Sequence, residues 1–496
     1  MRHFLGISAG FHDAAVSVVN SNGGIEFASH SERYSGRKND AELDPLLINT
    51  LRQWQFDEIA FYERPWMHNL QQIVSGQHQF GAWTARAAVQ QHLHGPASIR
   101  GQTTAPIRSF SHHLSHAAAG FQTSPFDSAA VVVIDAIGEL DTVSIYRAWY
   151  DHAGRAQYQR CWRQGYPHSI GLFYSAMTER VGLRPMDEEY ITMGMAAYGN
   201  NQRAPEMLAA FWQDWYQVRA RHNLHTGIND LWHDENPEDI AACAQTVIER
   251  IVRHVVMRAQ QITGETNLVY MGGVALNCLA NRGLGDYFDG IWIMPNPGDA
   301  GSSLGAAALT YGKRLNWQDA YLGHCIPGDY PVADLLHHLE TTGIVGAASG
   351  RAEFGPRALG NRSLLADPRG IDIRDRVNDI KQRQRFRPFA PVILEEHVAK
   401  YFEMPRNVTS SPYMQFVMRC RRPDLFPAIC HVDGTSRVQT VAPGGSGIRK
   451  LLEAWYAATE CPMLLNTSLN VRGEPMVNDR TDADRFERAY NIKVCS

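Results

Sequence analysis

The stretch His3–Val19, HFLGISAGFHDAAVSVV, sets the pattern from which the fold can be read. An apolar run is followed by a tight loop that contains Gly10 and His12, and a second apolar run comes next. Two such runs joined by a glycine loop are typical of a β-hairpin. The stretch Ala129–Tyr146, AAVVVIDAIGELDTVSIY, repeats this order with Gly138 in its loop. We therefore predict one strand–loop–strand unit that is used twice.

A duplicated unit of this kind resembles the way in which sugar kinases, actin and the heat-shock ATPases hold nucleotide phosphates. In those folds the backbone N–H groups of each loop turn toward the anion. The pattern favours an α/β fold with nucleotide bound near Gly10 and Gly138. Two ordinary hairpins are the alternative that the pattern leaves open.

Two later strands end in glycine turns that lead toward helices. Gly272 and Gly273 follow a strand and precede a helix start that carries Asn277. The stretch Ile291–Ala308, IWIMPNPGDAGSSLGAAA, places Asp299 in a turn before a helix of small residues. A strand–glycine–helix turn is a natural seat for adenosine or phosphate, so we expect nucleotide at Gly272, Gly273 and Asn277. Asp299 is well placed as a ligand and equally well placed as a helix N-cap.

The run Ser111–Gly120, SHHLSHAAAG, contains two histidines four residues apart. In a helix His112 and His116 share one face with their side chains about 6 Å apart, as a shared metal ion requires. His113 points about 100° away around the same helix and is not expected to join them. In a chain with 21 histidines, such a pair is more often core or surface filler. The pair alone is therefore a weak metal motif.

The last part of the chain, from about Val345, contains four short blocks in which Arg or Lys stands among glycine, proline or small hydroxyl residues. These blocks are GRAEFGPRALGNRSLLADPR (350–369), KQRQRFRPFAPVIL (381–394), HVDGTSRVQTV (431–441) and LLNTSLNVRGEP (464–475). One such block means little, but four in succession suggest a cleft that collects cations around phosphate groups. Residues 323–334, GHCIPGDYPVAD, have the composition of a linker. We therefore expect two domains, 1–335 and 345–496.

The composition limits the classes of protein to which this chain can belong. The 496 residues are 44% hydrophobic and 20% charged, as in globular proteins, and the formal net charge is −4. A protein that holds tRNA or DNA usually shows a basic excess, so we expect no nucleic-acid partner. No apolar run of about twenty residues and no signal-peptide pattern is visible, so we expect no membrane partner. Eight scattered cysteines without a CxxC pair are typical of reduced thiols in a cytoplasmic protein.

The motifs EFGPRALGNRS, FRPFAP, HVDGTSRVQTV and NTSLNVRGEP, with the HHxxHA run and the PGDAG turn, resemble those of the O-carbamoyltransferase family that includes nodulation protein U and the cephem and aminoglycoside carbamoyltransferases. The resemblance extends from the His12 loop to about Val477. It implies an N-terminal domain similar to the universal tRNA threonylcarbamoyl-transferring enzyme, with an actin-like ATPase fold built from a duplicated ribonuclease-H-like unit. It also implies a C-terminal α/β domain similar to the YrdC carbamoyl-adenylate-forming fold.

The resemblance implies site residues when it is carried over position by position. The family's metal ligands fall on His112, His116, Asp135 and Asp299, a set that suits Fe(II) and also fits zinc or manganese. The family's catalytic histidine falls on His12, which would position the carbamoyl group or take the acceptor proton. The positions implied for carbamoyl phosphate and ATP in the second domain are Arg357, Arg362, Lys381, Arg387, Arg437 and Ser468.

The implied function is that of an ATP-dependent O-carbamoyltransferase of secondary metabolism, such as antibiotic biosynthesis. The second domain would convert carbamoyl phosphate and ATP, with Mg²⁺, into carbamoyl-adenylate and pyrophosphate. The first domain would transfer the carbamoyl group to a hydroxyl of a small-molecule natural product, with residues 31–105 and 200–260 shaping the acceptor pocket. A homodimer is common among relatives. A tRNA threonylcarbamoyl-type transferase and a non-enzymatic nucleotide-binding module are the alternatives.

The sequence departs from the family at two places. Ile191 stands where relatives often have a lysine, so any phosphate contact of that lysine would be missing here. The last residues, AYNIKVCS, abbreviate the apolar strand that usually closes the second domain.

Overall fold

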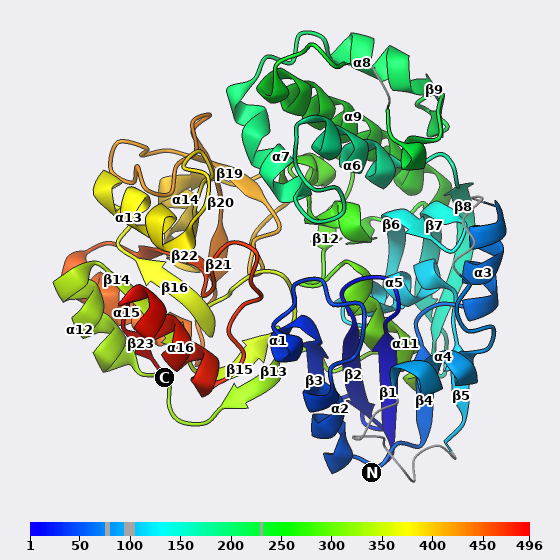
Figure 1. Cartoon of the computed structure of the whole chain (residues 1–496), viewed down its shortest axis with the longest axis horizontal. Helices are drawn as coiled ribbons and strands as arrows, with labels where there is room; N and C mark the ends of the chain where they lie inside the picture. Colours follow the sequence, from blue (N-terminus) through cyan, green and yellow to red (C-terminus); the bar gives the residue numbers. More distant parts are fainter. Residues whose placement is uncertain (75–79, 94–104, 229–231) are drawn as a thin grey trace. The chain divides into compact units, whose positions relative to one another are not determined.

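The structure is a computed structural model that describes residues 1–74, 80–93, 105–228 and 232–496, and the chain divides into two compact units (Figure 1). Unit 1 consists of Met1–Ser35, Asn39–Ala280 and Leu284–Asp319, and unit 2 of Gly36–Lys38, Asn281–Gly283 and Ala320–Ser496. Parts of the two stretches expected to shape the acceptor pocket, namely 75–79, 94–104 and 229–231, lie outside the described residues.

The first sheet of unit 1 has five strands in the order β3-β2-β1-β4-β5. The strands are β1 His3–Ser8, β2 Ala15–Asn20, β3 Ile25–His30, β4 Glu58–Phe61 and β5 Ile107–Ser109. The first three strands are antiparallel neighbours, and β4 and β5 are added parallel to β1. The hairpin expected in His3–Val19 is therefore the antiparallel pair β1–β2, and its loop carries His12.

The second sheet of unit 1 repeats this topology in the order β12-β11-β6-β7-β8. The strands are β6 Ser128–Gly138, β7 Asp141–Tyr150, β8 Ala156–Gly165, β11 Asn267–Met271 and β12 Gly290–Trp292. Again three antiparallel strands come first, and two parallel strands follow on the side of the first strand. The expected α/β class with a duplicated ribonuclease-H-like unit is confirmed.

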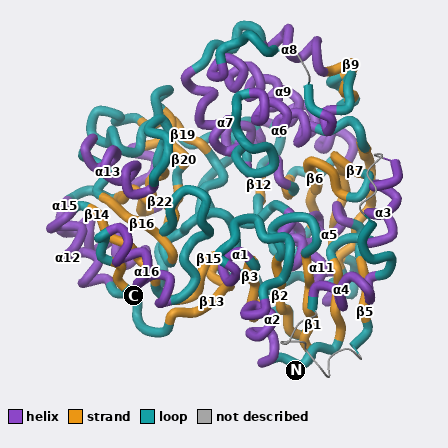
Figure 2. Tube along the Cα trace, viewed as in Figure 1, coloured by secondary structure: helices purple, strands orange, loops and turns teal. Residues whose placement is uncertain are grey.

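Two helices of small residues pack between these sheets, as the helices α5 and α11 of Figures 1 and 2 show. Helix α5, His112–Phe121, packs on β6 and β11, and α11, Ser302–Tyr311, packs on β1 and β2. Their backbones approach so closely that a Cβ on Gly305 would lie 1.8 Å from the carbonyl oxygen of Ser115. This close approach is the physical reason for the alanine and glycine runs in both helices.

The opposite face of β6 is covered by α6, Ile170–Arg180, and by the long helix α9, Pro237–Thr263. Helix α9 begins with the side chain of Asn236 as its N-cap and ends at Gly264 in the left-handed conformation. The remaining elements of unit 1 are α1 Glu32–Ser35, α2 Pro45–Thr50, α3 Pro65–Val74, α4 Ala85–His92, α7 Glu189–Met195, α8 Ala204–Phe211, β9 Trp212–Asp214 and β10 Arg219–Ala220.

Unit 2 is built on a mixed six-stranded sheet in the order β21-β17-β22-β16-β14-β23, an α/β unit as expected for a YrdC-like domain. These strands are β14 Ile344–Ala348, β16 Arg362–Ala366, β17 Ala390–Leu394, β21 Gln439–Val441, β22 Met463–Ser468 and β23 Val494–Cys495. Its helices are α12 Val332–Thr342, α13 Ile371–Lys381, α14 Val398–Tyr401, α15 Gly447–Thr459 and α16 Arg480–Tyr490. Two smaller sheets comprise β13 Tyr321–Ile326 with β15 Gly350–Glu353, and β18 Phe402–Glu403 with β19 Val417–Cys420 and β20 Thr435–Arg437.

The structure corrects three local expectations. Gly138, expected in the loop of the second hairpin, is the last residue of β6. The turn after β11 is a 3₁₀ turn over Gly273–Leu276, and Asn277 lies between this turn and the short helix α10, Cys278–Asn281, rather than on a helix. The linker expected at 323–334 is wrong, because this stretch contains the end of β13 and the start of α12.

The abbreviated end of the second domain still forms a strand. Val494 and Cys495 pair in parallel with Gly346 and Ala347 of β14, so the short sequence closes this edge of the sheet. Among the described residues, none of the helices combines the length and the apolar character that a membrane crossing needs.

Candidate metal centre

Two histidine side chains project from the start of α5 toward one point. The expected helix places His112 and His116 one turn apart, with relative exposures of 2% and 0%. Their Nε2 atoms are 3.0 Å apart. His113 turns away, and its Nδ1 lies 2.8 Å from the hydroxyl of Ser144, as its position on the helix predicts.

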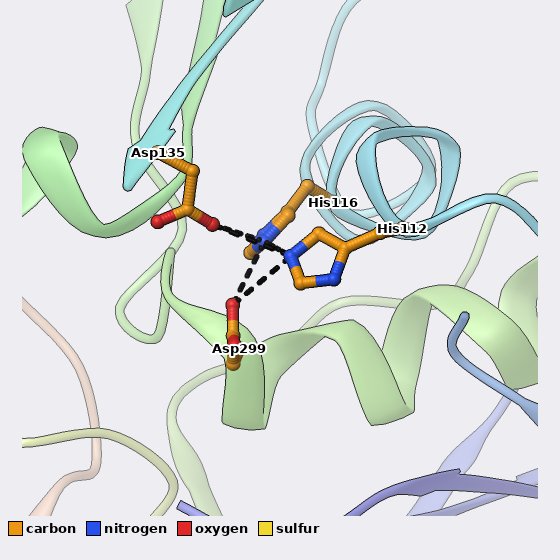
Figure 3. Close-up of side chains that lie close together, drawn as sticks. All are labelled: His112, His116, Asp135 and Asp299. Atoms are coloured by element: carbon orange, nitrogen blue, oxygen red, sulfur yellow. Dashed lines mark hydrogen bonds and ion pairs between the residues drawn. The ribbon is translucent and has the colours of Figure 1, made fainter. Parts of the chain in front are cut away.

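Two carboxylates from different parts of unit 1 meet these imidazoles (Figure 3). Asp135 lies on β6, and its Oδ2 is 3.3 Å from His112 Nε2 and 3.0 Å from His116 Nε2. Asp299 begins the 3₁₀ turn before α11, and its Oδ1 is 3.2 Å from both Nε2 atoms. The four side chains thus come from one helix, one strand and one turn, although they span almost 190 positions of sequence.

The geometry and chemistry of the four donors fit a metal ion. One ligand atom from each side chain lies within 4.8 Å of every other. For metal–ligand distances of about 2.0–2.1 Å, tetrahedral coordination places ligand atoms about 3.3 Å apart, close to the distances observed here. Two imidazole nitrogens and two carboxylate oxygens suit zinc, iron or manganese.

The charges of this cluster are coupled. Burial by itself lowers the pKa of His112 and His116, but the carboxylates of Asp135 and Asp299 raise both above the ordinary histidine value. Burial raises the pKa of Asp135, but hydrogen bonds from the two histidines hold it well below its usual range. Histidine ligands must be deprotonated, so metal binding here would release protons.

His12 lies beside this cluster rather than in it. Its Nε2 is 3.7 Å from Oδ2 of Asp299, which is the carboxylate oxygen that does not face His112 and His116. Its Nδ1 is 3.0 Å from Oδ2 of Asp13. Burial lowers the pKa of His12, but the hydrogen bond to Asp13 and the charge of Asp299 raise it to about 9. Asp299 therefore connects His12 with the four-donor cluster.

Sequence reasoning missed two acidic side chains at this site, Asp13 and Glu63. Glu63 is buried, and its Oε2 lies 3.6 Å from Nδ1 of His112, the ring nitrogen opposite the cluster. The ring of Tyr62 lies 5.1 Å from that of His112, centroid to centroid. Glu63 follows β4 closely, and an acidic residue at the carboxyl end of a parallel strand is the signal that could have identified it.

The glycines expected to bind nucleotide lie around the same cluster. A Cβ on Gly138 would lie 2.5 Å from Cδ2 of His112, so a side chain there would displace the imidazole. Gly272 has φ 90°, and a Cβ would lie 2.2 Å from the carbonyl oxygen of Ile134. Both positions therefore need glycine, because a Cβ would collide with protein atoms whether or not a nucleotide binds.

Gly273 and Gly10 complete this set. The backbone N–H of Gly273 is 3.4 Å from Oδ1 of Asp135. Gly10 has φ 104°, and its backbone N–H donates to the carbonyl oxygen of Ala41.

The side chain of Asn277 takes part in a hydrogen-bond network within the protein. It is buried, its Nδ2 donates to Oε1 of Gln245, and its Oδ1 accepts from Nε2 of Gln245 and from the backbone N–H of Ala280. The hydroxyl of Tyr174 donates to the same Gln245 oxygen at 2.7 Å. These contacts hold the turn after β11 against α6 and α9.

In unit 2, Arg362 is fully buried, and its guanidinium hydrogen-bonds to main-chain atoms. Its five N–H groups point at main-chain carbonyl oxygens, with donor–acceptor distances of 2.8–3.1 Å. The acceptors are the carbonyl oxygens of His324, Ser349, Gly350, Asn361 and Asn478. A guanidinium has five N–H donors, so this arrangement leaves none for a phosphate oxygen.

Lys381 and Ser468 lie in direct contact. The Nζ of Lys381 donates to Oγ of Ser468 at 3.0 Å, to its carbonyl oxygen at 2.5 Å, and to Oδ1 of Asn470 at 2.6 Å. Burial, followed by the charges of Arg383 and Arg387, lowers the pKa of Lys381 well below the usual lysine value. These three acceptors match the three N–H donors of an ammonium group, so Lys381 would stabilise a bound anion through its charge and not through a further N–H.

The other three cations implied for this domain, Arg357, Arg387 and Arg437, are half-buried. The loop that carries Arg357 is rigidly held. Oε1 of Glu353 accepts backbone N–H groups from Leu359 at 2.8 Å and from Asn361 at 2.9 Å. The loop therefore presents Arg357 in a fixed backbone conformation.

Comparison with known proteins places both halves of the chain. The family models described as carbamoyltransferase N-terminus and carbamoyltransferase C-terminus match residues 3–308 and 336–495. The chain is 33% identical to an uncharacterised protein of Synechocystis sp., over 98% of this chain and 94% of that one. It is 34% identical to nodulation protein NolO of Bradyrhizobium diazoefficiens over 75% of each chain. It is 37% identical to the 3'-hydroxymethylcephem-O-carbamoyltransferase of Amycolatopsis lactamdurans, over 50% of this chain and 51% of that protein.

Proposed function

This chain belongs to the carbamoyltransferase family, and on that premise we propose that it is an ATP-dependent O-carbamoyltransferase of secondary metabolism. Its acceptor is a hydroxyl group of a small-molecule natural product, with antibiotic biosynthesis as one setting, and a homodimer is part of the same proposal. The observation that carries the proposal is the convergence of His112, His116, Asp135 and Asp299 beside His12.

We assign activation of the carbamoyl group to residues 345–496. Carbamoyl phosphate and ATP, with Mg²⁺, give carbamoyl-adenylate, pyrophosphate and inorganic phosphate, and one water is consumed. Lys381, Ser468, Arg357, Arg387 and Arg437 bind the anionic groups, because a cluster of cations neutralises phosphate charge where two polyanions meet. The contacts of Arg362 favour a structural role, in which its guanidinium holds the surrounding loops by their carbonyl oxygens.

We assign transfer to residues 1–335. His112, His116, Asp135 and Asp299 hold the metal ion, with Fe(II) favoured by the resemblance and zinc or manganese also compatible with the donors. When bound, the metal supplies Lewis-acid polarisation of the carbamoyl carbonyl group and neutralises phosphate charge.

His12 contributes on the side of Asp299 that faces away from the other ligands. In the transfer step the acceptor oxygen forms a bond with the carbamoyl carbon, and the bond from that carbon to the adenylate oxygen breaks, which releases AMP. The hydroxyl proton must leave the acceptor. His12 either takes it, in the neutral form that a cation bound at the cluster would favour, or orients the carbamoyl group for attack. The glycines at positions 10, 138, 272 and 273 leave room for the nucleotide, and those at 138 and 273 also keep side chains away from His112 and Asp135.

The test is incubation of the protein with carbamoyl phosphate, ATP, Mg²⁺ and Fe(II), together with a panel of hydroxyl compounds. Mass spectrometry detects an acceptor that has gained one carbamoyl group, and AMP and pyrophosphate are measured in parallel. We expect AMP formation that depends on carbamoyl phosphate and a carbamoylated product with at least one acceptor. Absence of pyrophosphate release from ATP in the presence of carbamoyl phosphate would contradict the activation step.

A further inference from the structure

We propose that Asp13 is a positioning residue that fixes the ring of His12 by accepting the N–H of its Nδ1. This inference rests on the proposed function, because the part of His12 in carbamoyl transfer belongs to that proposal. Asp13 acts through His12, because its carboxylate bonds to the imidazole of His12 and is not one of the four side chains that could hold the metal.

The first argument is the geometry around the imidazole of His12. Its Nδ1 is 3.0 Å from Oδ2 of Asp13, a hydrogen-bond distance, and its Nε2 is 3.7 Å from Oδ2 of Asp299. The ring is thus held between two carboxylates, one on its own loop and one that belongs to the cluster. When Asp13 accepts the proton on Nδ1, the orientation of the ring is fixed and Nε2 faces the cluster.

The second argument is the backbone of Asp13 itself. Its φ is 52°, in the left-handed region, which costs an ordinary residue about 1–2 kcal/mol and costs glycine almost nothing. The loop is anchored on both sides, by the backbone N–H of Gly10 on Ala41 and by that of Ala14 on Asp40. Glycine would satisfy this backbone more easily, so the carboxylate is what aspartate adds at this position.

The left-handed backbone of Asp13 makes Asp13→Gly an informative substitution. Asp13→Gly removes the carboxylate and relieves the left-handed strain, so the thermal midpoint should stay the same or rise. Asp13→Asn keeps the size and a conformation that asparagine tolerates, but it replaces the charged acceptor by an amide. Asn407→Gly is the matched control, because Asn407 is an exposed residue of unit 2 with φ 55°.

Two measurements test the inference. The first is the proton NMR spectrum at low temperature, in which an imidazole N–H that is hydrogen-bonded to a carboxylate appears far downfield. The signal of His12 is the one that disappears in His12→Gln. We expect it in the wild type and in Asn407→Gly, and we expect it to be absent from Asp13→Gly.

The second measurement is the rate of carbamoyl transfer beside the rate of pyrophosphate release in a single turnover. We expect Asp13→Gly and Asp13→Asn to lower kcat of transfer by about 10²–10⁴-fold, as loss of a carboxylate that orients a catalytic histidine does elsewhere. The single-turnover release of pyrophosphate and its dependence on ATP and carbamoyl phosphate should stay within about twofold of the wild type, because unit 2 is unchanged.

The outcomes separate this inference from the proposed function. Transfer within twofold of the wild type in Asp13→Gly, or an unchanged downfield signal, overturns the role of Asp13. A parallel loss of thermal stability, pyrophosphate release and transfer in both variants also overturns it, because it indicates a structural role. If the wild type carbamoylates no acceptor at all, the proposed function fails, and the NMR comparison still decides whether Asp13 fixes His12.

Discussion

The cluster around His112 in unit 1 and the guanidinium of Arg362 in unit 2 are both buried, but their charges are balanced in different ways. At Arg362 every N–H group meets a main-chain carbonyl oxygen, so the fold itself satisfies the charged group. In the cluster, four side chains each turn one ligand atom toward the same point, with two Nε2 atoms 3.0 Å apart. Two imidazole nitrogens at this distance repel each other unless a proton or a cation lies between or beside them. The comparison teaches that a buried charge satisfied by main chain belongs to the scaffold, whereas side chains that converge on one point form a site for a ligand.

Removing a ligand should cause the largest effect. His112→Ala leaves three donors, and we expect loss of detectable metal binding and at least about a 10³-fold loss of carbamoyl transfer. The thermal midpoint of the metal-free protein should also fall, because Asp135 and Asp299 lose a hydrogen-bonded partner of opposite charge, so both assays are run where the variant is still folded. Elemental mass spectrometry measures the metal content, and the transfer assay measures the loss of carbamoyl transfer.

The matched control for this prediction is His113→Ala on the same helix. His113 bonds to Ser144 and not to the cluster, so this variant should keep its metal while it loses some stability. Full transfer activity in His112→Ala would contradict the assignment of the cluster as the metal site.

Arg362 provides the opposite test. Arg362→Met keeps most of the volume but leaves five carbonyl oxygens without their donor, and we expect the free energy of unfolding to fall by about 3–5 kcal/mol. Denaturant titration measures the change. Arg385→Met is the control, because Arg385 is exposed and its contact with Asp379 is a long 3.4 Å, so the expected cost is below about 0.5 kcal/mol. A stable Arg362→Met variant that fails only in binding of carbamoyl phosphate would restore the anion-binding role that the family motif implies.

This contrast also explains how far the sequence could predict the site. The spacing of His112 and His116 predicts their shared helix face, and the turn at Asp299 predicts either a ligand or an N-cap. Asp135 joins them only through the resemblance to the family's metal ligands. The spacing cannot predict whether the donors of Arg362 or the amide of Asn277 are used by the protein. That depends on carbonyl oxygens and on Gln245, which lie far away in sequence.

The fold shows the same division between local and long-range information. The alternation of apolar strands and glycine loops predicts the duplicated hairpins β1–β2 and β6–β7, because these are local pairings. The stretch at 323–334 has the composition of a linker, but it enters a strand because β15, which pairs with β13, comes about 25 residues later. Glu63 was missed for the same reason, since only the packing of β4 beside α5 brings it to His112.

Glu63 offers a smaller and finer test of the cluster. A carboxylate behind a histidine ligand orients the ring, and its loss typically costs 10–100-fold in metal affinity. We therefore expect Glu63→Gln to weaken metal binding by about 10-fold or more without loss of the four donors. Competition with a chromogenic chelator measures the affinity. Glu42→Gln is the control, because Glu42 pairs with His92 at 2.9 Å outside the cluster, and equal weakening in both variants would argue against a specific effect of Glu63.

The smallest expected effect concerns a buried histidine that has no part in the cluster. Burial, followed by the charge of Arg33, lowers the pKa of His30 to about 4, whereas the unfolded chain has the ordinary value of about 6.5. Between these values the unfolded state binds a proton that the folded state excludes, so His30 costs stability as the pH falls below 6.5. From pH 7 to pH 5.5 we expect the wild type to lose about 1 kcal/mol more than His30→Gln in urea titrations, in the presence of chelator. Identical pH dependence in the two proteins would contradict the lowered pKa of His30 in the folded state.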